Sequence, residues 1–161
     1  MSQNIIRLSK VVPFGFGSIF LLMISIGFAS KLSMDKLAEA IELQTHTYVV
    51  KTNLQDMEKD LVDAETGQRG FIFTGKEEFL SPYKNGKIAF VQAANKTKEL
   101  IKDNPEQVKN LEQVEKLGQQ KLDELAETIS LKRAGKEPEL RALVLSGKGQ
   151  IFMDEIRERI A

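Results

Sequence analysis

An uncharged run of twenty residues, 11–30, constrains this chain more than any other feature. At about 1.5 Å per residue, a helix of this length spans about 30 Å, the thickness of the hydrocarbon core of a bilayer. We therefore expect residues 11–30 to form a transmembrane helix. A cleaved signal peptide is the alternative, because Gly27 and Ala29 place small residues where a signal peptidase would cleave. The run is longer than a usual signal-peptide core, and helix-forming sequence continues beyond it.

The charges that flank this run indicate its orientation. Arg7 and Lys10 precede it without any acid, whereas bases and acids are mixed after it. The positive-inside rule therefore puts residues 1–10 in the cytoplasm and residues 31–161 outside it, in the periplasm or the extracellular space. We expect a single-pass protein of the inner (plasma) membrane, with the lipid bilayer as its first partner.

The composition excludes several classes of function. Three of the 23 bases lie in residues 1–31, so twenty bases and 23 acids remain for the rest of the chain. This mildly acidic balance offers no basic stripe, and nucleic acid is not expected as a partner. The chain has no cysteine, which excludes disulfides, thiolate catalysis and zinc-thiolate sites.

Apolar residues after residue 31 recur at steps of three and four, the spacing of helices that bury one face. The first helical stretch continues from the membrane segment, and breaks are expected near residues 74–81, 102–105 and 134–138. In the last stretch we assign Val144, Gly147 and Ile151, among others, to the buried stripe. Four such helices with short connections predict an all-α fold: an N-terminal transmembrane helix that continues into an antiparallel four-helix bundle.

Local turn chemistry supports these breaks. Gly75 suits a left-handed residue that closes the first stretch, and Ser81 and Pro82 are expected to cap and begin the second. Asn104 is expected to cap the third stretch, with Gln107 three residues later, as in a capping box.

A glycine-containing segment near the end of the first long helix differs from the rest. Gly67 and Gly70 cost about 1 kcal/mol each in a helix, whereas the Glu65 and Arg69 pair returns only about 0.3–0.5 kcal/mol. A tertiary interaction must therefore compensate. Either the glycines allow the connector at 76–80 or a neighbouring helix to approach closely, or the segment is a ligand-binding or signal-responsive site in which Arg69 presents its planar cation. The two interpretations are compatible.

The same segment carries a family resemblance. The pattern resembles the third class of CHASE domains, which are extracellular sensory domains associated with histidine kinases and cyclases, and the similarity extends over residues 35–160. The residues of this family motif, structural or sensory in role, are Asp63, Glu65, Thr66, Gly67, Gln68, Arg69, Gly70, Thr74, Gly75, Phe79, Leu80, Pro82 and Tyr83.

This resemblance implies a helical sensory domain held between two membrane helices. Such a domain feeds a histidine kinase, a nucleotide cyclase or a chemotaxis-type output, and the ligand does not follow from the resemblance. The chain ends before a second membrane span, so the output is expected in a cytoplasmic domain outside this sequence or in a partner receptor.

No enzymatic activity is expected. His46 is the single histidine, and the residues after it lack the acid and proline of a kinase phosphoacceptor. Glu42 and His46 have the wrong spacing for a di-iron site, and no nucleophile elbow, phosphate loop or dinucleotide fingerprint occurs. We therefore predict no catalytic, cofactor-binding or metal-binding residues.

The sequence thus predicts a membrane-anchored sensory input domain of a bacterial signal-transduction system. It would detect a small-molecule or physical stimulus outside the cytoplasm and transmit it by a small displacement of the first helix against the last. A homodimer is expected, although the spacing of Ser25 and Ala29 does not by itself establish one. A ligand-free membrane-tethered scaffold or oligomerisation bundle is the alternative, because amphipathic helices also bind partner helices.

Overall fold

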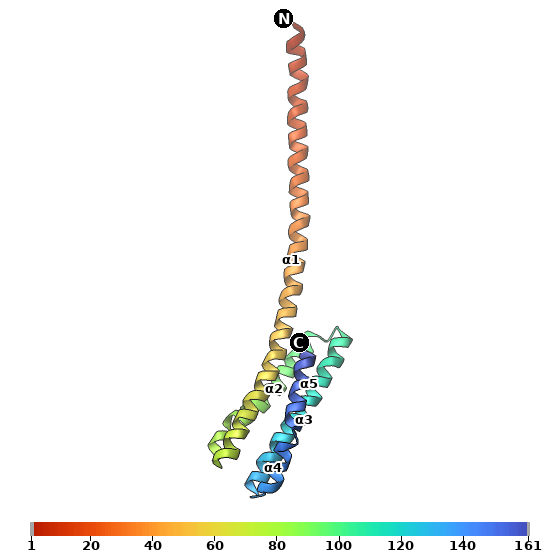
Figure 1. Ribbon diagram of the computed structural model, residues 1–161. Helices are drawn as coiled ribbons and strands as arrows, with labels where there is room; N and C mark the ends of the chain where they lie inside the picture. Colours follow the sequence, from red (N-terminus) through yellow and green to blue (C-terminus); the bar gives the residue numbers. More distant parts are fainter. Residues whose placement is uncertain (1, 161) are drawn as a thin grey trace. The chain divides into compact units, whose positions relative to one another are not determined.

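The computed structural model describes the backbone of residues 2–160 and the side chains of residues 15–160. No strand occurs within residues 2–160, and the predicted all-α class is confirmed. The chain divides into two compact units, residues 1–45 and 46–161 (Figure 1). The elements, in order, are α1 (Ser2–Thr74), η1 (Glu77–Leu80, a short 3-10 helix), α2 (Ser81–Leu100), α3 (Pro105–Arg133), α4 (Glu137–Leu145) and α5 (Lys148–Ile160).

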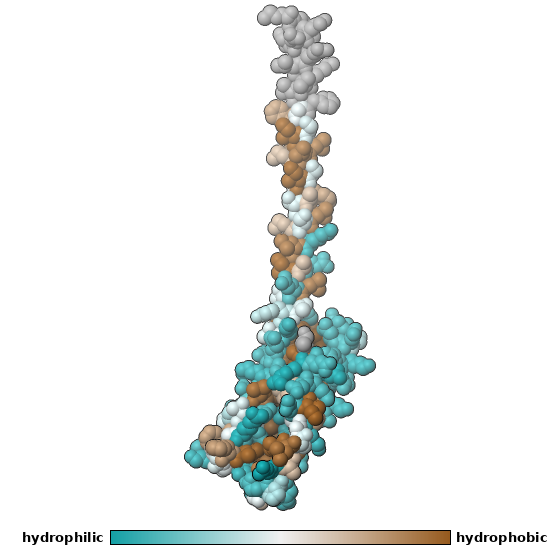
Figure 2. Space-filling model, in the orientation of Figure 1, coloured by the Kyte–Doolittle hydropathy of each residue, from teal (hydrophilic) through white to brown (hydrophobic). Residues whose placement is uncertain are grey.

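The first unit is formed by the N-terminal part of α1. Large apolar side chains from Phe16 to Phe28 are 53–72% exposed, and Figure 2 shows this part of the helix as mostly apolar. The Ser25 hydroxyl donates to the Leu22 carbonyl at 2.9 Å, so its polar group is satisfied within the helix. Within the described residues, α1 is the one helix long and apolar enough to cross a membrane. The side chains of residues 1–14, on which the cytoplasmic assignment of residues 1–10 depends, lie outside the described part.

The second unit is the predicted four-helix bundle, in which residues 46–74 of α1 pack with α2, α3 and the α4–α5 pair (Figure 1). Met57, Leu61 and Ala64 form a fully buried stripe on α1, at the spacing of one helix face. The other buried members of this core are Phe90, Ala94, Ile101, Leu111, Val114, Leu117, Leu122, Leu125, Met153 and Ile156.

Two of the predicted turns have the expected chemistry, and one differs slightly. Gly75 ends α1 with a φ of 72°, and its N–H donates to the Phe71 carbonyl at 2.7 Å. The Asn104 side chain accepts from the Gln107 N–H at 3.2 Å and caps α3. Ser81, however, is the first residue of α2 and not its cap, because the chain enters the helix one residue earlier than the sequence indicates.

The last predicted stretch is wrong in one respect, because it is two helices, α4 and α5. Gly147 has a φ of 67°, a left-handed conformation that ends α4 and that a side chain would disfavour. The three-and-four spacing that placed Gly147 in a continuous stripe is therefore interrupted at that residue. Val144 and Ile151, assigned to the same buried stripe, are 53% and 54% exposed.

Candidate functional site

The family motif lies on the last turns of α1 and continues through η1 into the first turn of α2. The two faces of its α1 part have different surroundings. On one face, a Cβ added to Gly67 would lie 2.6 Å from the Tyr83 nitrogen and 3.0 Å from the Phe79 carbonyl oxygen. A Cβ on Gly70 would lie 2.9 Å from Cδ1 of Phe79. Both glycines therefore allow η1 and the start of α2 to lie directly against the α1 backbone.

Other motif residues hold this end of the bundle together. Leu80 is buried in a small cluster with Phe71 and Ile129. The Thr74 hydroxyl donates to the Gly70 carbonyl at 2.7 Å and accepts the Lys76 N–H at 3.2 Å, which fixes the chain as it leaves α1. Pro82 stands in the first turn of α2, where its missing N–H costs nothing.

Asp63 lies elsewhere on the surface of α1, one turn after Lys59. Its carboxylate accepts from the Lys59 ammonium at 3.0 Å, and both side chains are about half or more exposed. This hydrogen bond raises the pKa of Lys59 above its ordinary value. Asp63 therefore belongs to a solvated helix surface and does not join the other charged motif residues.

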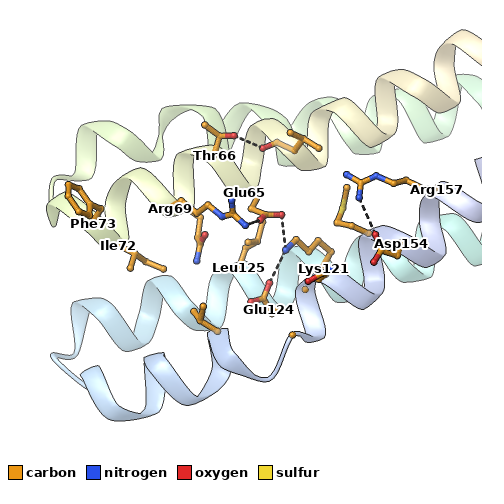
Figure 3. Close-up of a pocket in the computed structure, with 17 residues that line it drawn as sticks. Glu65, Thr66, Arg69, Ile72, Phe73, Lys121, Glu124, Leu125, Asp154 and Arg157 are labelled. Carbon is orange, nitrogen blue, oxygen red and sulfur yellow. Dashed lines mark hydrogen bonds and ion pairs between the residues drawn. The ribbon is translucent and has the colours of Figure 1, made fainter.

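The opposite face of the motif lines a groove of about 630 Å³ between α1, α3 and the α4–α5 turn (Figure 3). A volume of this size is within the range of small-molecule sites. The groove is lined from α1 by Val62, Glu65, Thr66, Gln68, Arg69, Ile72 and Phe73, from α3 by Lys121, Glu124 and Leu125, and from the last part of the chain by Val144, Gly147, Gly149, Gln150, Met153, Asp154 and Arg157.

A buried ion cluster lies in the middle of this groove. The Lys121 ammonium is 3.0 Å from a carboxylate oxygen of Glu65 and 3.2 Å from one of Glu124. The Lys121 side chain is only 4% exposed, and Glu65 also pairs with Arg69 (Figure 3). A buried ammonium is costly unless it is paired, so the two carboxylates are what make this position tolerable for a lysine.

The first turn of α5 packs over this cluster at Gly149, a residue that has no side chain. A Cβ on Gly149 would lie 2.5 Å from Nζ of Lys121 and 2.7 Å from Oε2 of Glu124. Gly149 therefore brings the first turn of α5 against the charged pair. The sequence analysis did not select Lys121, Glu124 or Gly149, although Lys121 lies four residues from both Leu117 and Leu125 on the buried face of α3. A lysine at an apolar-stripe position is the signal that would have found it.

A buried hydrogen bond fixes α1 to α3 beside the cluster. The Gln68 side-chain amide donates to the Thr128 hydroxyl at 2.7 Å, and this hydroxyl donates to the Leu125 carbonyl at 2.8 Å. Gln68 is 4% exposed and Thr128 is fully buried. Because both polar groups are buried, removing one of them leaves the other without a partner and out of water. This loss destabilises the fold by more than the bond itself contributes to stability.

At the other end of the groove, Arg157 connects α5 to α1. Its Nε donates to Oε1 of Glu58 at 2.7 Å, and its Nη1 donates to Asp154 at 3.2 Å. The hydrogen bond with Glu58 raises the pKa of Arg157 above its ordinary value, so the guanidinium stays charged. The groove is therefore bordered by an ionic contact between the first and last helices.

The remaining chemical candidates stand apart from the groove. His46 has Nε2 at 2.8 Å from the Leu100 carbonyl oxygen, so its ring serves a contact between α1 and the end of α2. Among residues 15–160, no group of three or more histidine or acidic side chains is arranged to hold a metal ion.

Comparisons with known proteins agree with this architecture. No match was found among curated protein sequences. A solved structure, the sensor domain of the Rhodopseudomonas palustris histidine kinase HK9, is similar with a TM-score of 0.63 and 19% identity, covering 69% of this chain and 87% of that one. At this identity the similarity concerns the fold alone. The model of the CHASE3 domain matches residues 40–161, which is most of the chain, and the protein thus belongs to the CHASE3 family of sensory domains.

Proposed function

We propose that this protein is a membrane-anchored sensory input domain of a bacterial signal-transduction system, without enzymatic activity of its own. Residues 11–30 cross the inner (plasma) membrane, residues 1–10 are cytoplasmic, and the bundle faces the periplasm or the extracellular space. The exposed apolar surface of α1 and its lysine- and arginine-containing start support this topology. The signal passes to a histidine kinase, cyclase or chemotaxis-type output.

One observation carries the sensory mechanism: the groove is lined by the family motif on α1 and also by α5. The Arg157–Glu58 contact joins the same two helices at 2.7 Å. A molecule or force that acts on this groove therefore acts on the spacing of the first and last helices. We propose that α1 shifts against α5 by a small translation or rotation, as packed helix pairs allow.

The receptor acts as a homodimer in this proposal. Leu37, Ile41 and Tyr48 follow one another at steps of four and seven on α1, and they are 60%, 54% and 70% exposed. Steps of this kind place side chains on one face of a helix, where a second copy of the same helix can cover them. Shifts in α1 would then be passed to the partner.

The ligand-free scaffold has less support than sensing. The exposed stripe of Leu37, Ile41 and Tyr48 fits a scaffold as well as a receptor dimer, but a scaffold does not need a groove with six charged side chains in its lining. Buried ionic contacts add little to stability compared with apolar packing, so their presence is better explained by a response than by a structural need.

The test sets the spacing of α1 and α5 directly. The chain has no cysteine, so Glu58→Cys with Arg157→Cys creates a unique pair. The full chain is joined through a second membrane helix to a histidine kinase, and the pair is bridged with bismaleimides of increasing length. We expect kinase output to change with the length of the bridge.

The control is Lys132→Cys with Glu137→Cys, which replaces an ion pair of 2.7 Å between the end of α3 and the start of α4 and does not involve α1. Bridging this pair should leave output unchanged. Output that is the same for every bridge between α1 and α5 would contradict transmission through these two helices.

A further inference from the structure

The two ends of the groove differ in chemistry. At one end the lining is apolar, with Ile72 half-buried, Val144 53% exposed and Phe73 91% exposed. The middle and the opposite end carry the charged residues, as Figure 3 shows for Glu65, Arg69 and Arg157. An aromatic ring that is almost wholly in water beside a groove is a surface that a ligand with an apolar body would cover.

Arg69 is the cation of the central cluster with spare binding capacity. Lys121 is buried between two carboxylates, whereas the Arg69 side chain is 77% exposed and pairs with Glu65 through Nη2. A guanidinium has five N–H donors in a planar fork that fits a carboxylate. The acids of the cluster, in contrast, are already held: Glu65 pairs with both cations.

The start of α5 adds a second positive element on the far side of the groove. α5 begins at Lys148, and Gly149 and Gln150 of its first turn line the groove. The N-terminus of a helix carries a partial positive charge. In α5, the Lys148 N–H donates to the Ser146 hydroxyl at 3.4 Å and the Gln150 N–H donates to the Gly147 carbonyl at 3.0 Å. The Lys121 ammonium and the Glu124 carboxylate occupy the space beside Gly149, so the helix start adds a partial positive charge to this side of the groove, and Arg69 supplies the donors for an anion.

From this arrangement we infer that the groove binds a small amphipathic organic anion. The carboxylate of the ligand pairs with Arg69 and faces the start of α5, and its apolar body covers Ile72, Phe73 and Val144. A volume of about 630 Å³ accommodates one short chain or ring and not a two-chain lipid. This ligand class applies to the sensory role proposed above. The biological meaning of the binding rests on that role, whereas the binding itself does not.

The experiment measures binding to the full chain in phosphatidylcholine nanodiscs, with empty nanodiscs as the blank. The probes are octanoate, octanol with the same body but no charge, and acetate with the charge but no body. We expect octanoate to bind saturably and to raise the unfolding midpoint, octanol to bind at least tenfold more weakly, and acetate to show no binding. Equal binding of octanoate and octanol, or no binding of octanoate, would overturn the inference.

Two variants locate the site. Arg69→Gln should weaken octanoate binding at least tenfold while leaving octanol unchanged, and Val144→Asp should weaken both. Arg141→Gln, on the exposed surface of α4 outside the groove, is the matched control and should bind octanoate as the wild type does. Circular dichroism checks that each variant is folded. Full octanoate affinity in folded Arg69→Gln would also overturn the inference.

A last arm separates a free anion from a lipid headgroup. Nanodiscs that contain phosphatidylglycerol should leave octanoate affinity unchanged, and displacement of octanoate by this lipid would overturn the assignment to a small ligand. The ligand class and the proposed function fail separately. If no anion binds but bridges of different length between α1 and α5 still change kinase output, the sensory mechanism stands and the ligand belongs to another class.

Discussion

Two layers of the bundle interior, one at Gly118 and one at Lys121, lie one helical turn apart on α3. In each layer a glycine leaves room for a neighbouring side chain, but the kind of neighbour differs. At Gly118, the Phe90 ring occupies the space of a side chain, since an added Cβ would lie 2.1 Å from Cζ of that ring. At Gly149, which packs against Lys121, the space is taken by an ammonium and a carboxylate. Burial of the ring stabilises the fold directly. In the ion pair, the attraction between the two charges only offsets the cost of removing them from water. The apolar layer should therefore contribute much more to stability than the charged layer does.

The largest effect is expected in the apolar layer. Phe90 is 3% exposed, and Phe90→Ala should lower the free energy of unfolding by about 3–5 kcal/mol because it leaves a cavity beside Gly118. Urea denaturation of residues 32–161, followed by circular dichroism, measures the loss.

A second substitution checks that this loss comes from the cavity. Gly118→Leu in the Phe90→Ala background should recover part of the stability, although Gly118→Leu alone should be destabilising because of the clash with the ring. Additive effects of the two substitutions would show that the two residues are not coupled.

The charged layer should respond more weakly. Lys121→Met leaves Glu124 without its cation, whereas Glu65 keeps Arg69. Removing one partner of a fully buried pair costs about 3–5 kcal/mol, and the residual exposure of the two carboxylates reduces our expectation to about 2–3 kcal/mol. The same denaturation experiment measures it.

The matched test removes both charges. Lys121→Met with Glu124→Leu should return the free energy of unfolding to within about 1 kcal/mol of the wild type, because an apolar pair of similar size replaces the ion pair. If the double variant is as unstable as Lys121→Met, the ion cluster contributes to stability itself, and the contrast between the two layers fails.

The smallest effect is expected at an exposed ion pair outside both layers. Arg133 binds Glu77 through two hydrogen bonds of 2.7 Å, and these hold the pKa of Glu77 below its ordinary value. The stabilisation is present above the ordinary pKa of a glutamate, about 4.3, and is lost as the pH falls through the lower folded-state pKa. Glu77→Gln should therefore lower the unfolding midpoint slightly at pH 7 and not at pH 2. A difference between the two proteins that persists at pH 2 would assign the effect to packing.

Local chemistry made much of the fold predictable. Gly75, Pro82 and Asn104 determine their turns with their own backbones and side chains, so the breaks near them follow from the sequence. The break at Gly147 was missed because a glycine at a stripe position is equally compatible with close packing in a helix and with a left-handed turn. The direction that the chain takes after Gly147 decides between close packing in a helix and a left-handed turn.

The candidate site was predictable only in part. The motif on α1 identified Glu65 and Arg69, and their i, i+4 pairing is present. The partners from α3 and α5 were not found, because the burial of Lys121 depends on Glu65 and on Gly149, which are 56 residues before it and 28 residues after it. No local pattern in α3 specifies that neighbourhood.

The buried bond between Gln68 and Thr128 has a consequence for how faithfully the domain reports its surroundings. A hydrogen bond of 2.7 Å tolerates a displacement of well under an ångström before it weakens steeply. Sliding of α1 along α3 therefore breaks this bond and leaves buried polar groups unpaired, at a cost of about 1–3 kcal/mol. In the mechanism proposed above, this bond adds a fixed cost to any state in which α1 has moved relative to α3, so it favours the resting state until a stimulus offsets that cost.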